Sequence, residues 1–257
     1  KLDLVPLTAD GFRFVGLYMK NSRDWMVAGE ACFKTGVVIV PMYDTLGAGV
    51  VAYIQGQTQC RTVICTQAEL KNLLPPNDCP FSDVVISGPL DDATKAQCAQ
   101  ASFRLHHFDD LERLGSTDTS AADVPPPVYN DTALLCYTSG TTGDPKGAMI
   151  SHGNVLAALA MADHPDFTVF NFDPATPQEV HLSYLPLAHI FETVIIQTAI
   201  LGAAAIGFYQ GDTLKILEDL SALRPTFFIS VPRLYNRIYD KITGGLGEKS
   251  AIAKALF

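Results

Sequence analysis

The sequence predicts an α/β protein with a largely parallel sheet that helices cover on both faces. Short runs of β-branched and other apolar residues alternate along the chain with segments of helical periodicity. The short runs are almost continuously apolar, which is typical of strands that are buried on both faces. A length of 257 residues, 48% of them hydrophobic and 18% charged, indicates a compact chain with one large domain or two subdomains.

The first part of the chain contains five predicted strands. The first is Phe14 to Met19, and Ser22 is a suitable N-cap for the helix that follows, which Gly36 ends. Val37 to Val40 is the second strand, and a helix from about Ala48 to Gln55 comes after it. The remaining predicted strands, which short helices separate, are Thr62 to Cys65, Asp83 to Ser87 and Phe103 to Phe108.

A change in composition predicts a division of the chain into two α/β units. Residues 115–128 are rich in Ser, Thr, Ala, Asp and Pro, and are predicted to form a linker. The first subdomain is therefore expected at 1–128, including this linker, and the start of a second one at 129–257.

The second unit begins with two short strands around a polar loop. The strands are Ala133 to Cys136 and Ala148 to Ile150, and a helix is predicted to start after Ser151. Strand–helix repeats are expected to continue to Tyr239. Within them lie a predicted surface loop (Asp163 to Gln178), a buried helix followed by a buried strand (Val194 to Tyr209), and a buried strand (Phe227 to Ile229).

The polar loop is the most informative stretch for function. Residues Tyr137 to Gly147 read Tyr-Thr-Ser-Gly-Thr-Thr-Gly-Asp-Pro-Lys-Gly. Glycines permit positive φ and a close approach of backbone N–H groups to an anion, and Lys146 adds a compact positive charge. A glycine-rich loop by itself is also compatible with a simple turn. Lys146 lacks the preceding Gly and following Ser or Thr of the common NTPase loop, and Ser139 lacks the spacing of a serine-hydrolase elbow.

The loop resembles, nearly residue for residue, the phosphate loop of the adenylate-forming enzymes. Further segments resemble the long-chain fatty acyl-CoA synthetases (fatty acid–CoA ligases) within that superfamily. These segments are Val38 to Gly47, Tyr184 to Glu192, Gly207 to Asp212 and Val231 to Ile242. The resemblance runs in order from about Gly11 to Ile242, which is nearly the whole chain.

This resemblance implies a fold and an activity. The fold is the N-terminal large domain of the adenylate-forming enzymes, with two stacked, mostly parallel sheets and helices on their faces. The activity is ATP-dependent activation of a long-chain fatty acid through an acyl-adenylate, followed by thioester formation with CoA, with Mg²⁺ as the metal. Two alternatives stay open: a ligase for an aryl, amino or shorter acid, and a non-catalytic nucleotide-binding or scaffold relative.

The resemblance also implies the site residues. Thr141, Lys146 and His189 are the expected catalytic residues. The expected nucleotide-binding residues are Thr138, Ser139, Gly140, Thr141, Thr142, Gly143, Lys146 and Gly147. No metal-ligating residue is assigned, and a zinc site is not expected, because the histidines other than His189 have no ligand spacing with cysteines or carboxylates.

Several residues have two readings. His189 is either a site residue or a histidine near a helix start that the backbone satisfies. Glu192 belongs either to a metal site or polar network or to a salt bridge on a helix face. Arg233 is a candidate for a phosphate or carboxylate contact, or for a structural ion pair. The small apolar residues between Ile195 and Phe208 either form core or line a tunnel for an alkyl chain.

Charge and cysteine content narrow the partners and the compartment. A formal net charge of -9 argues against nucleic acid as a partner, so fatty acid, ATP and CoA are the expected ones. Six cysteines without a C-x-x-C pair favour free thiols and an intracellular location, cytoplasmic or on the cytosolic face of a membrane. The apolar stretch from Val194 to Tyr209 is shorter than the ~20 residues of a membrane span, and peripheral contact with a membrane is expected only because the substrate dissolves there.

Motifs that the family carries further along its sequence do not occur in this chain. These are the Tyr-Gly-x-Thr-Glu motif with a metal-binding glutamate, the ribose-binding aspartate, the hinge and the C-terminal lid with its lysine. The chain is therefore expected to be an N-terminal fragment that binds pyrophosphate-like anions weakly and does not form acyl-CoA alone.

Overall fold

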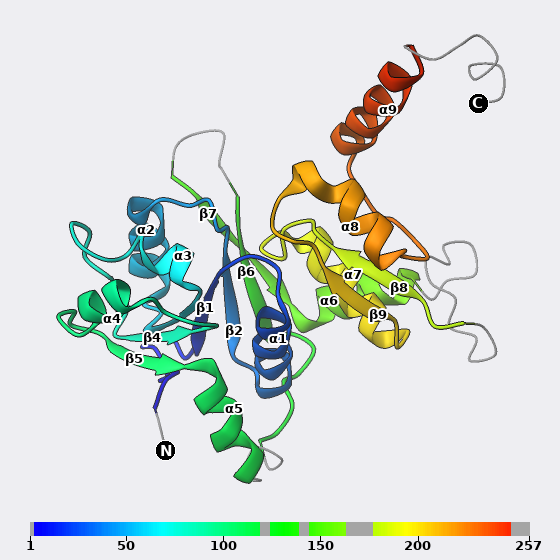
Figure 1. The fold of residues 1–257 in the computed structure, drawn as a ribbon. Helices are drawn as coiled ribbons and strands as arrows, with labels where there is room; N and C mark the ends of the chain where they lie inside the picture. Colours follow the sequence, from blue (N-terminus) through cyan, green and yellow to red (C-terminus); the bar gives the residue numbers. More distant parts are fainter. Residues whose placement is uncertain (1–2, 119–123, 139–143, 163–176, 248–257) are drawn as a thin grey trace.

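The computed structural model describes residues 3–118, 124–138, 144–162 and 177–247. In these residues, short strands alternate with helices along the chain (Figure 1). The strands are β1 (Phe14–Tyr18), β2 (Val38–Met42), β3 (Thr62–Cys65), β4 (Asp83–Ile86), β5 (Arg104–His107), β6 (Thr132–Thr138), β7 (Lys146–Ser151), β8 (Val180–Ser183) and β9 (Ala205–Phe208). The helices are α1 (Arg23–Thr35), α2 (Ala48–Thr58), α3 (Gln67–Leu70), α4 (Asp92–Cys98), α5 (Phe108–Thr117), α6 (His152–Ala162), α7 (Ile190–Leu201), α8 (Ile216–Leu223) and α9 (Pro232–Gly247), with a short 3-10 helix at Thr213–Lys215.

Two sheets organise these elements. The larger has seven strands in the order β5-β4-β3-β1-β2-β6-β7, and the smaller pairs β8 with β9. All the pairings are parallel except that of β6 with β7, which is antiparallel. The predicted α/β class with a mostly parallel sheet is confirmed.

Helices cover both faces of the larger sheet. Side chains alternate between the two faces along each strand, and here both sets are apolar and have to be buried. On β2, Val38, Val40 and Met42 point to one core with α2 and α3, whereas Ile39 points to a second core. This second core contains buried side chains of α1, α5, α6 and α7, among them Trp25, Phe108, Val155 and Ile196. Both faces are thus buried, as the continuous apolar runs predicted.

The first helix illustrates how local sequence sets an element's limits. Ser22 has an extended backbone and its side chain accepts a hydrogen bond from the Trp25 amide. Gly36 ends α1 with φ 67°, a conformation that costs glycine little. The cap and the stop predicted for this helix are both confirmed.

The sheet does not follow the predicted division at residue 128. β6 starts after that boundary, yet it pairs in parallel with β2 through Ile39 and Leu134. The smaller sheet begins only at Val180. The larger sheet therefore extends across residue 128, because the apolar strand β6 pairs with β2 and is largely buried there (Figure 1). The division into two subdomains stays a prediction.

One predicted strand is wrong. Phe227 makes a single bridge to His181, and no strand continues through Phe228 and Ile229. Side chains take the backbone acceptors there: the Tyr184 hydroxyl donates to the Ile229 carbonyl at 3.1 Å, and the Tyr235 hydroxyl donates to the Phe228 carbonyl at 2.8 Å. The predicted surface loop at 163–178 lies almost wholly outside the described residues. In the described part of the chain, no helix combines the length and the apolar character that crossing a membrane requires.

All six cysteines are free thiols, and five of them are buried. Burial is the main cause that raises the pKa of each one, to about 12 for Cys32 and Cys60 and to about 11 for Cys136. Cys79 is more exposed than the other five cysteines, because its side chain is half-buried. Thiolate is the reactive form, so the folded chain should hold very little of it at neutral pH.

We therefore expect slow reaction of the native chain with Ellman's reagent, with Cys79 reacting first. In guanidinium chloride all six thiols should react rapidly, because unfolding removes the burial that raises their pKa. A Cys79→Ser variant is the control, and it should lose the earliest phase alone. Rapid native labelling of Cys32 or Cys60 would contradict the buried positions described here.

Candidate functional site

The hairpin of β6 and β7 carries the two ends of the predicted phosphate loop. Thr138 is the last residue of β6, Lys146 is the first of β7, and the two are direct partners across the hairpin. Both residues are exposed. The loop residues between them, Ser139, Gly140, Thr141, Thr142 and Gly143, lie outside the described residues. The structure thus places the mouth of the loop, including the expected site residues Thr138, Lys146 and Gly147.

The mouth lies at the carboxyl edge of the larger sheet. β6 runs parallel to β2, and β2 runs parallel to β1, so all three strands end at the same edge. Thr138 therefore shares this edge with Tyr18 and Met42, the last residues of β1 and β2. Open α/β sheets bind ligands at this edge, because the loops that follow the strands converge there.

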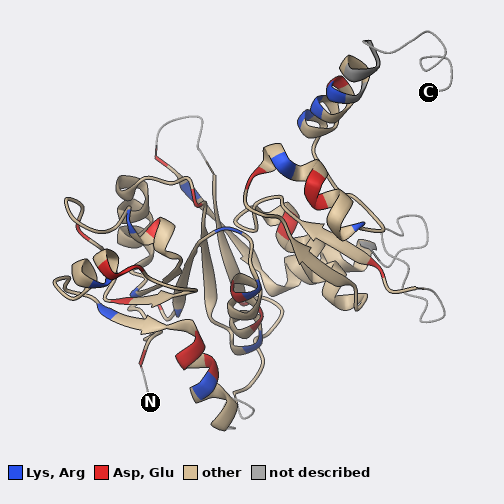
Figure 2. Cartoon of the chain, viewed as in Figure 1, with Lys and Arg blue, Asp and Glu red and all other residues tan. Residues whose placement is uncertain are grey.

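Lys146 is available for a ligand. It makes no ion pair with the described residues, and it lines a cavity of about 490 Å³ together with Gly147 and Tyr137. Figure 2 shows that Lys and Arg elsewhere are spread over many elements and interspersed with Asp and Glu. With a net charge of -9, an anionic ligand has to be held by such local donors, since the overall field repels it.

Gly147 has a different role in the backbone from the one expected. It is a strand residue and does not adopt positive φ. A Cβ atom at this position would lie 3.0 Å from the ring of Tyr137, its partner across the hairpin. The Tyr137 hydroxyl donates a hydrogen bond to Oε1 of Gln57 at 3.0 Å, and burial raises its pKa, so the ring is a neutral donor. Gly147 is needed here for the space that the ring occupies.

His189 lies at the start of α7 and is exposed. It is the N-cap residue, and its Nδ1 accepts a hydrogen bond from the Phe191 amide at 3.1 Å. Its Nε2 has no hydrogen-bond partner among the described residues. The backbone thus satisfies one ring nitrogen and fixes the ring's orientation, and the other nitrogen is open to a ligand.

The segment before His189 packs against the same edge of the sheet. A small cavity of about 20 Å³ lies between the ends of β1 and β2 and this segment. It is lined by Met19, Lys20, Asn21, Met42, Tyr43, Asp44, Pro186, Leu187, Ala188 and Tyr209. The two motifs that the sequence singled out, Tyr137 to Gly147 and Tyr184 to Glu192, therefore meet one sheet edge, although 36 residues separate them along the chain.

Glu192 belongs to a buried polar cluster and not to a surface salt bridge. Its side chain is 1% exposed, the Ser183 hydroxyl donates to its Oε1 at 2.7 Å, and Nε2 of His181 lies 3.2 Å from the same oxygen. Asn21 joins this cluster through Ser183. Sequence reasoning missed Asn21, although its place directly after the first strand, at the edge where ligands bind, was a signal.

The remaining candidate residues lie outside this polar cluster. Arg233 is exposed near the start of α9 and forms no ion pair with the described residues. Ile195 and Ala199 are buried and pack against Ala204, Ile206 and Phe227. Within the described residues, no group of three His, Cys, Asp or Glu side chains could hold a metal ion.

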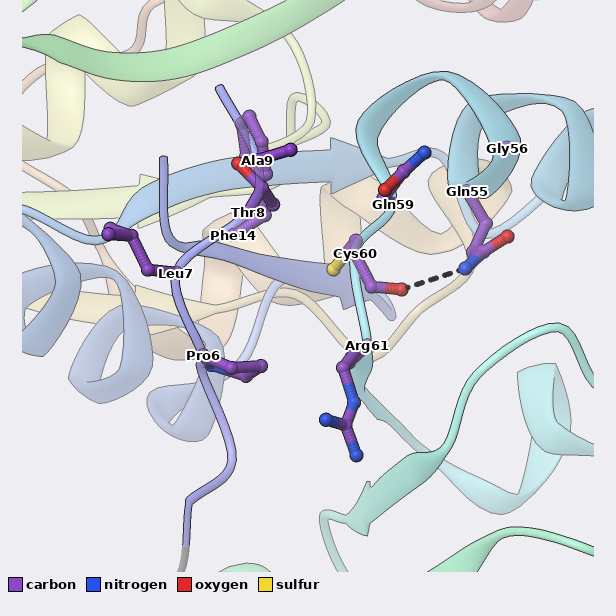
Figure 3. A pocket seen from close by; sticks show the side chains of 10 residues that line it. All are labelled: Pro6, Leu7, Thr8, Ala9, Phe14, Gln55, Gly56, Gln59, Cys60 and Arg61. Carbon is purple, nitrogen blue, oxygen red and sulfur yellow. Dashed lines mark hydrogen bonds between the residues drawn. The ribbon is translucent and has the colours of Figure 1, made fainter. Parts of the chain in front are cut away.

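A larger cavity of about 570 Å³ lies at the opposite edge of the sheet (Figure 3). Phe14, at the start of β1, and Arg61, just before β3, are among its lining residues. The side chain of Gln55 closes one side by donating to the Cys60 carbonyl at 3.1 Å. None of the sequence-predicted site residues lines this cavity, so we assign it no part in the site.

The sequence of this chain matches a known protein family and known relatives. The model of the family described as AMP-binding enzyme matches residues 9–254. The chain is 38% identical over 248 residues to the peroxisomal long chain acyl-CoA synthetase 7 of Arabidopsis thaliana. This match covers 95% of this chain and 34% of that protein. It is 36% identical over 235 residues to long-chain-fatty-acid–CoA ligase 5 of Rattus norvegicus, covering 90% of this chain and 34% of the relative. The chain thus spans about a third of the length of these relatives.

Solved structures share the fold. The A-PCP didomain of the carboxylic acid reductase from Segniliparus rugosus, in complex with AMP, superposes with a TM-score of 0.75 at 21% identity. That match covers 95% of this chain and 36% of the other. A putative long-chain-fatty-acid CoA ligase from Rhodopseudomonas palustris has a TM-score of 0.65 at 20% identity, covering 88% of this chain and 52% of that one. At such identities the likeness concerns the fold alone.

Proposed function

The chain belongs to the AMP-binding enzyme family, and from this membership we propose that it forms the phosphate-loop part of a long-chain fatty acid–CoA ligase. In the proposed reaction a fatty acid carboxylate attacks the α-phosphorus of ATP, which yields an acyl-adenylate and pyrophosphate. The thiol of CoA then attacks the acyl carbon and displaces AMP. ATP, CoA and the fatty acid are thus the proposed partners.

One observation carries the proposal. The hairpin presents Thr138 and Lys146 as exposed cross-strand partners at the mouth of the loop, on the sheet edge where α/β proteins bind ligands. A hydroxyl donor and an ammonium group without an ion-pair partner among the described residues suit a polyphosphate, which offers many oxygen acceptors.

These groups support the first half of the reaction. Negative charge accumulates on the departing pyrophosphate as the bond to the α-phosphorus breaks. Donors that are fixed around those oxygens stabilise the transition state more than the bound ATP. We assign this role to Lys146 and to the loop residues with it, and we assign His189, with its open Nε2, to the place where the carboxylate and the α-phosphate meet.

Mg²⁺ remains a prediction from the resemblance. The described residues offer no cluster of carboxylates or histidines that fits this ion, so no step is derived through it. Divalent cations in nucleotide sites bind chiefly to phosphate oxygens and to one or two carboxylates.

The acyl substrate is inferred from relatives. Relatives that are 35–38% identical over at least 90% of this chain bear the names of long-chain acyl-CoA synthetases or long-chain fatty acid ligases. The packing of Ile195 and Ala199 against β9 favours a core role for these two side chains. Other residues then have to determine which acyl chain lengths the protein accepts. Peripheral contact with a membrane surface is part of the proposal, because a long-chain fatty acid dissolves in the membrane.

Exchange of labelled pyrophosphate into ATP tests the proposal. It is measured on a full-length protein that includes this chain, with fatty acids of short, medium and long chain, an aryl acid and an amino acid. Exchange that depends on the long-chain acids supports the proposed substrate class. Exchange with the aryl or amino acid alone favours a ligase for another carboxylate, and nucleotide binding without any exchange favours a non-catalytic relative.

A further inference from the structure

A buried polar cluster joins three elements around the segment that leads to His189. Its members are Asn21 after β1, His181 and Ser183 on β8, and Glu192 in the first turn of α7. Each of these side chains is at most 9% exposed. Burying such groups costs free energy unless they are hydrogen-bonded, so their arrangement is constrained by their partners.

Asn21 makes three hydrogen bonds with its carboxamide, and two of them reach the backbone of this segment. Its Nδ2 donates to the Leu185 carbonyl at 2.7 Å, and its Oδ1 accepts from the Leu187 amide at 2.9 Å. The second hydrogen of Nδ2 is donated to the Ser183 hydroxyl at 2.8 Å. A carboxamide is needed for this pattern, because it combines two donors with an acceptor.

Ser183 links Asn21 to α7 by hydrogen bonds. Its hydroxyl accepts from Asn21 and donates to Oε1 of Glu192 at 2.7 Å. Glu192 follows His189 by three residues, and Thr193 next to it donates to the Leu187 carbonyl at 3.0 Å. The first turn of α7 is therefore tied both to β8 and to the segment that precedes the helix.

These bonds fix the backbone on both sides of His189. The amide of His189 donates to the Pro186 carbonyl at 2.9 Å, inside the segment that Asn21 holds, and the carbonyl of His189 accepts from the Thr193 amide at 3.2 Å. Because the ring is also held by the Phe191 amide, the position of Nε2 depends on this backbone. A shift of the segment would move Nε2 relative to the sheet edge.

We propose that Asn21 and Glu192 are positioning residues for His189. They clasp the segment Leu185–His189 and the start of α7 to the end of β1, and they act on the reaction through the place of the His189 ring. The inference rests on the proposed function, in which His189 is a site residue. Neither Asn21 nor Glu192 touches the ligand in this account.

Amide hydrogen exchange on this chain tests the clasp without any enzyme activity. Asn21→Ala should speed exchange of the Leu187 amide by at least about tenfold relative to amides of β3, because its acceptor is removed. Asn21→Asp has the same size and keeps an acceptor for the Leu187 amide, but it places an oxygen against the Leu185 carbonyl, so exchange at Leu187 should be faster than in wild type and slower than in Asn21→Ala. Thr198→Val is the matched control: Thr198 is buried on α7, and among the described residues its hydroxyl bonds within its own helix, to the Val194 carbonyl. Loss of this hydroxyl should leave exchange of the Leu187 amide unchanged.

The effect on the reaction is tested by a double-mutant cycle in the full-length protein. Asn21→Ala should lower kcat of pyrophosphate exchange by ~10- to 100-fold and change KM for ATP little, as expected for a misplaced group. In a His189→Ala background, Asn21→Ala should have almost no further effect, because Asn21 acts through His189. An equal loss in both backgrounds would overturn the proposal, since Asn21 would then act independently.

Conservative replacement provides the second line of evidence. Both contacts of Glu192 reach the same oxygen, Oε1, so Glu192→Gln can keep them and should retain kcat, whereas Glu192→Leu should match Asn21→Ala. An inactive Glu192→Gln that folds normally would contradict the proposal. A wild-type protein that shows no exchange with any acid would refute the proposed function instead, and hydrogen exchange at Leu187 would still decide whether the clasp exists.

Discussion

Replacing Lys146 by alanine is expected to lower the rate of pyrophosphate exchange by about 10²- to 10³-fold, the usual loss when one fixed transition-state donor is removed. The reason lies in the local charge. Lys146 is the first residue of β7, it is exposed, and it has no ion pair with the described residues, so its ammonium group is not already neutralised by the protein. The chain as a whole is negative, which leaves few substitutes for this charge.

The measurement is steady-state exchange in a full-length protein that includes the chain, with saturating fatty acid. Lys95→Ala is the matched control, because Lys95 is also exposed but pairs with Asp92 on α4, and its loss should leave the rate unchanged. A Lys146→Ala protein that works within about threefold of the wild-type rate would remove Lys146 from the site.

The second large effect concerns stability and its dependence on pH. Arg104→Met is expected to reduce the free energy of unfolding at neutral pH, because it leaves a buried carboxylate without its main partner. Asp83 is completely buried at the start of β4, and Arg104 contacts both of its oxygens, at 2.7 and 2.8 Å. His106 remains at 3.0 Å, which limits the expected loss.

The pH dependence follows from the pKa of Asp83. Burial alone would raise this pKa, but the hydrogen bonds and charges of Arg104 and His106 outweigh burial and lower it. A carboxyl whose folded pKa lies below the unfolded value of about 3.9 contributes stability above that pH and loses it as the pH falls. In Arg104→Met the main lowering cause is gone, so the difference from wild type should be largest at neutral pH and shrink below about pH 4.

Chemical unfolding followed by circular dichroism over this pH range provides the measurement. Arg113→Met is the control, since Arg113 pairs with Asp110 on the exposed surface of α5 and should change stability by no more than about 0.5 kcal/mol. A loss for Arg104→Met that is the same at acidic and neutral pH would mean that the packing of the arginine stem, and not the ion pair, stabilises the fold.

Local sequence was sufficient for much of this fold. Continuous apolar runs, the Ser22 cap and the Gly36 stop act over a few residues, so they predict elements without knowledge of what lies across the core. The same holds for the two strands that flank the phosphate loop, which the sequence predicted, whereas their antiparallel pairing in a hairpin comes from the structure.

Long-range packing decided the rest. Gly147 was expected to give the loop a positive φ, but in the hairpin it makes room for the Tyr137 ring, a contact that only the strand register creates. Phe228 and Ile229 have the composition of a strand, yet tyrosines from elsewhere in the chain take their carbonyls. Asn21 follows the first strand at the edge where ligands bind, but its role depends on partners more than 160 residues away, which its place in the sequence does not reveal. A single side chain records its own preference for helix, strand or turn, whereas its hydrogen-bond partners are chosen by the way the strands and helices pack, and this is information that only the tertiary structure contains.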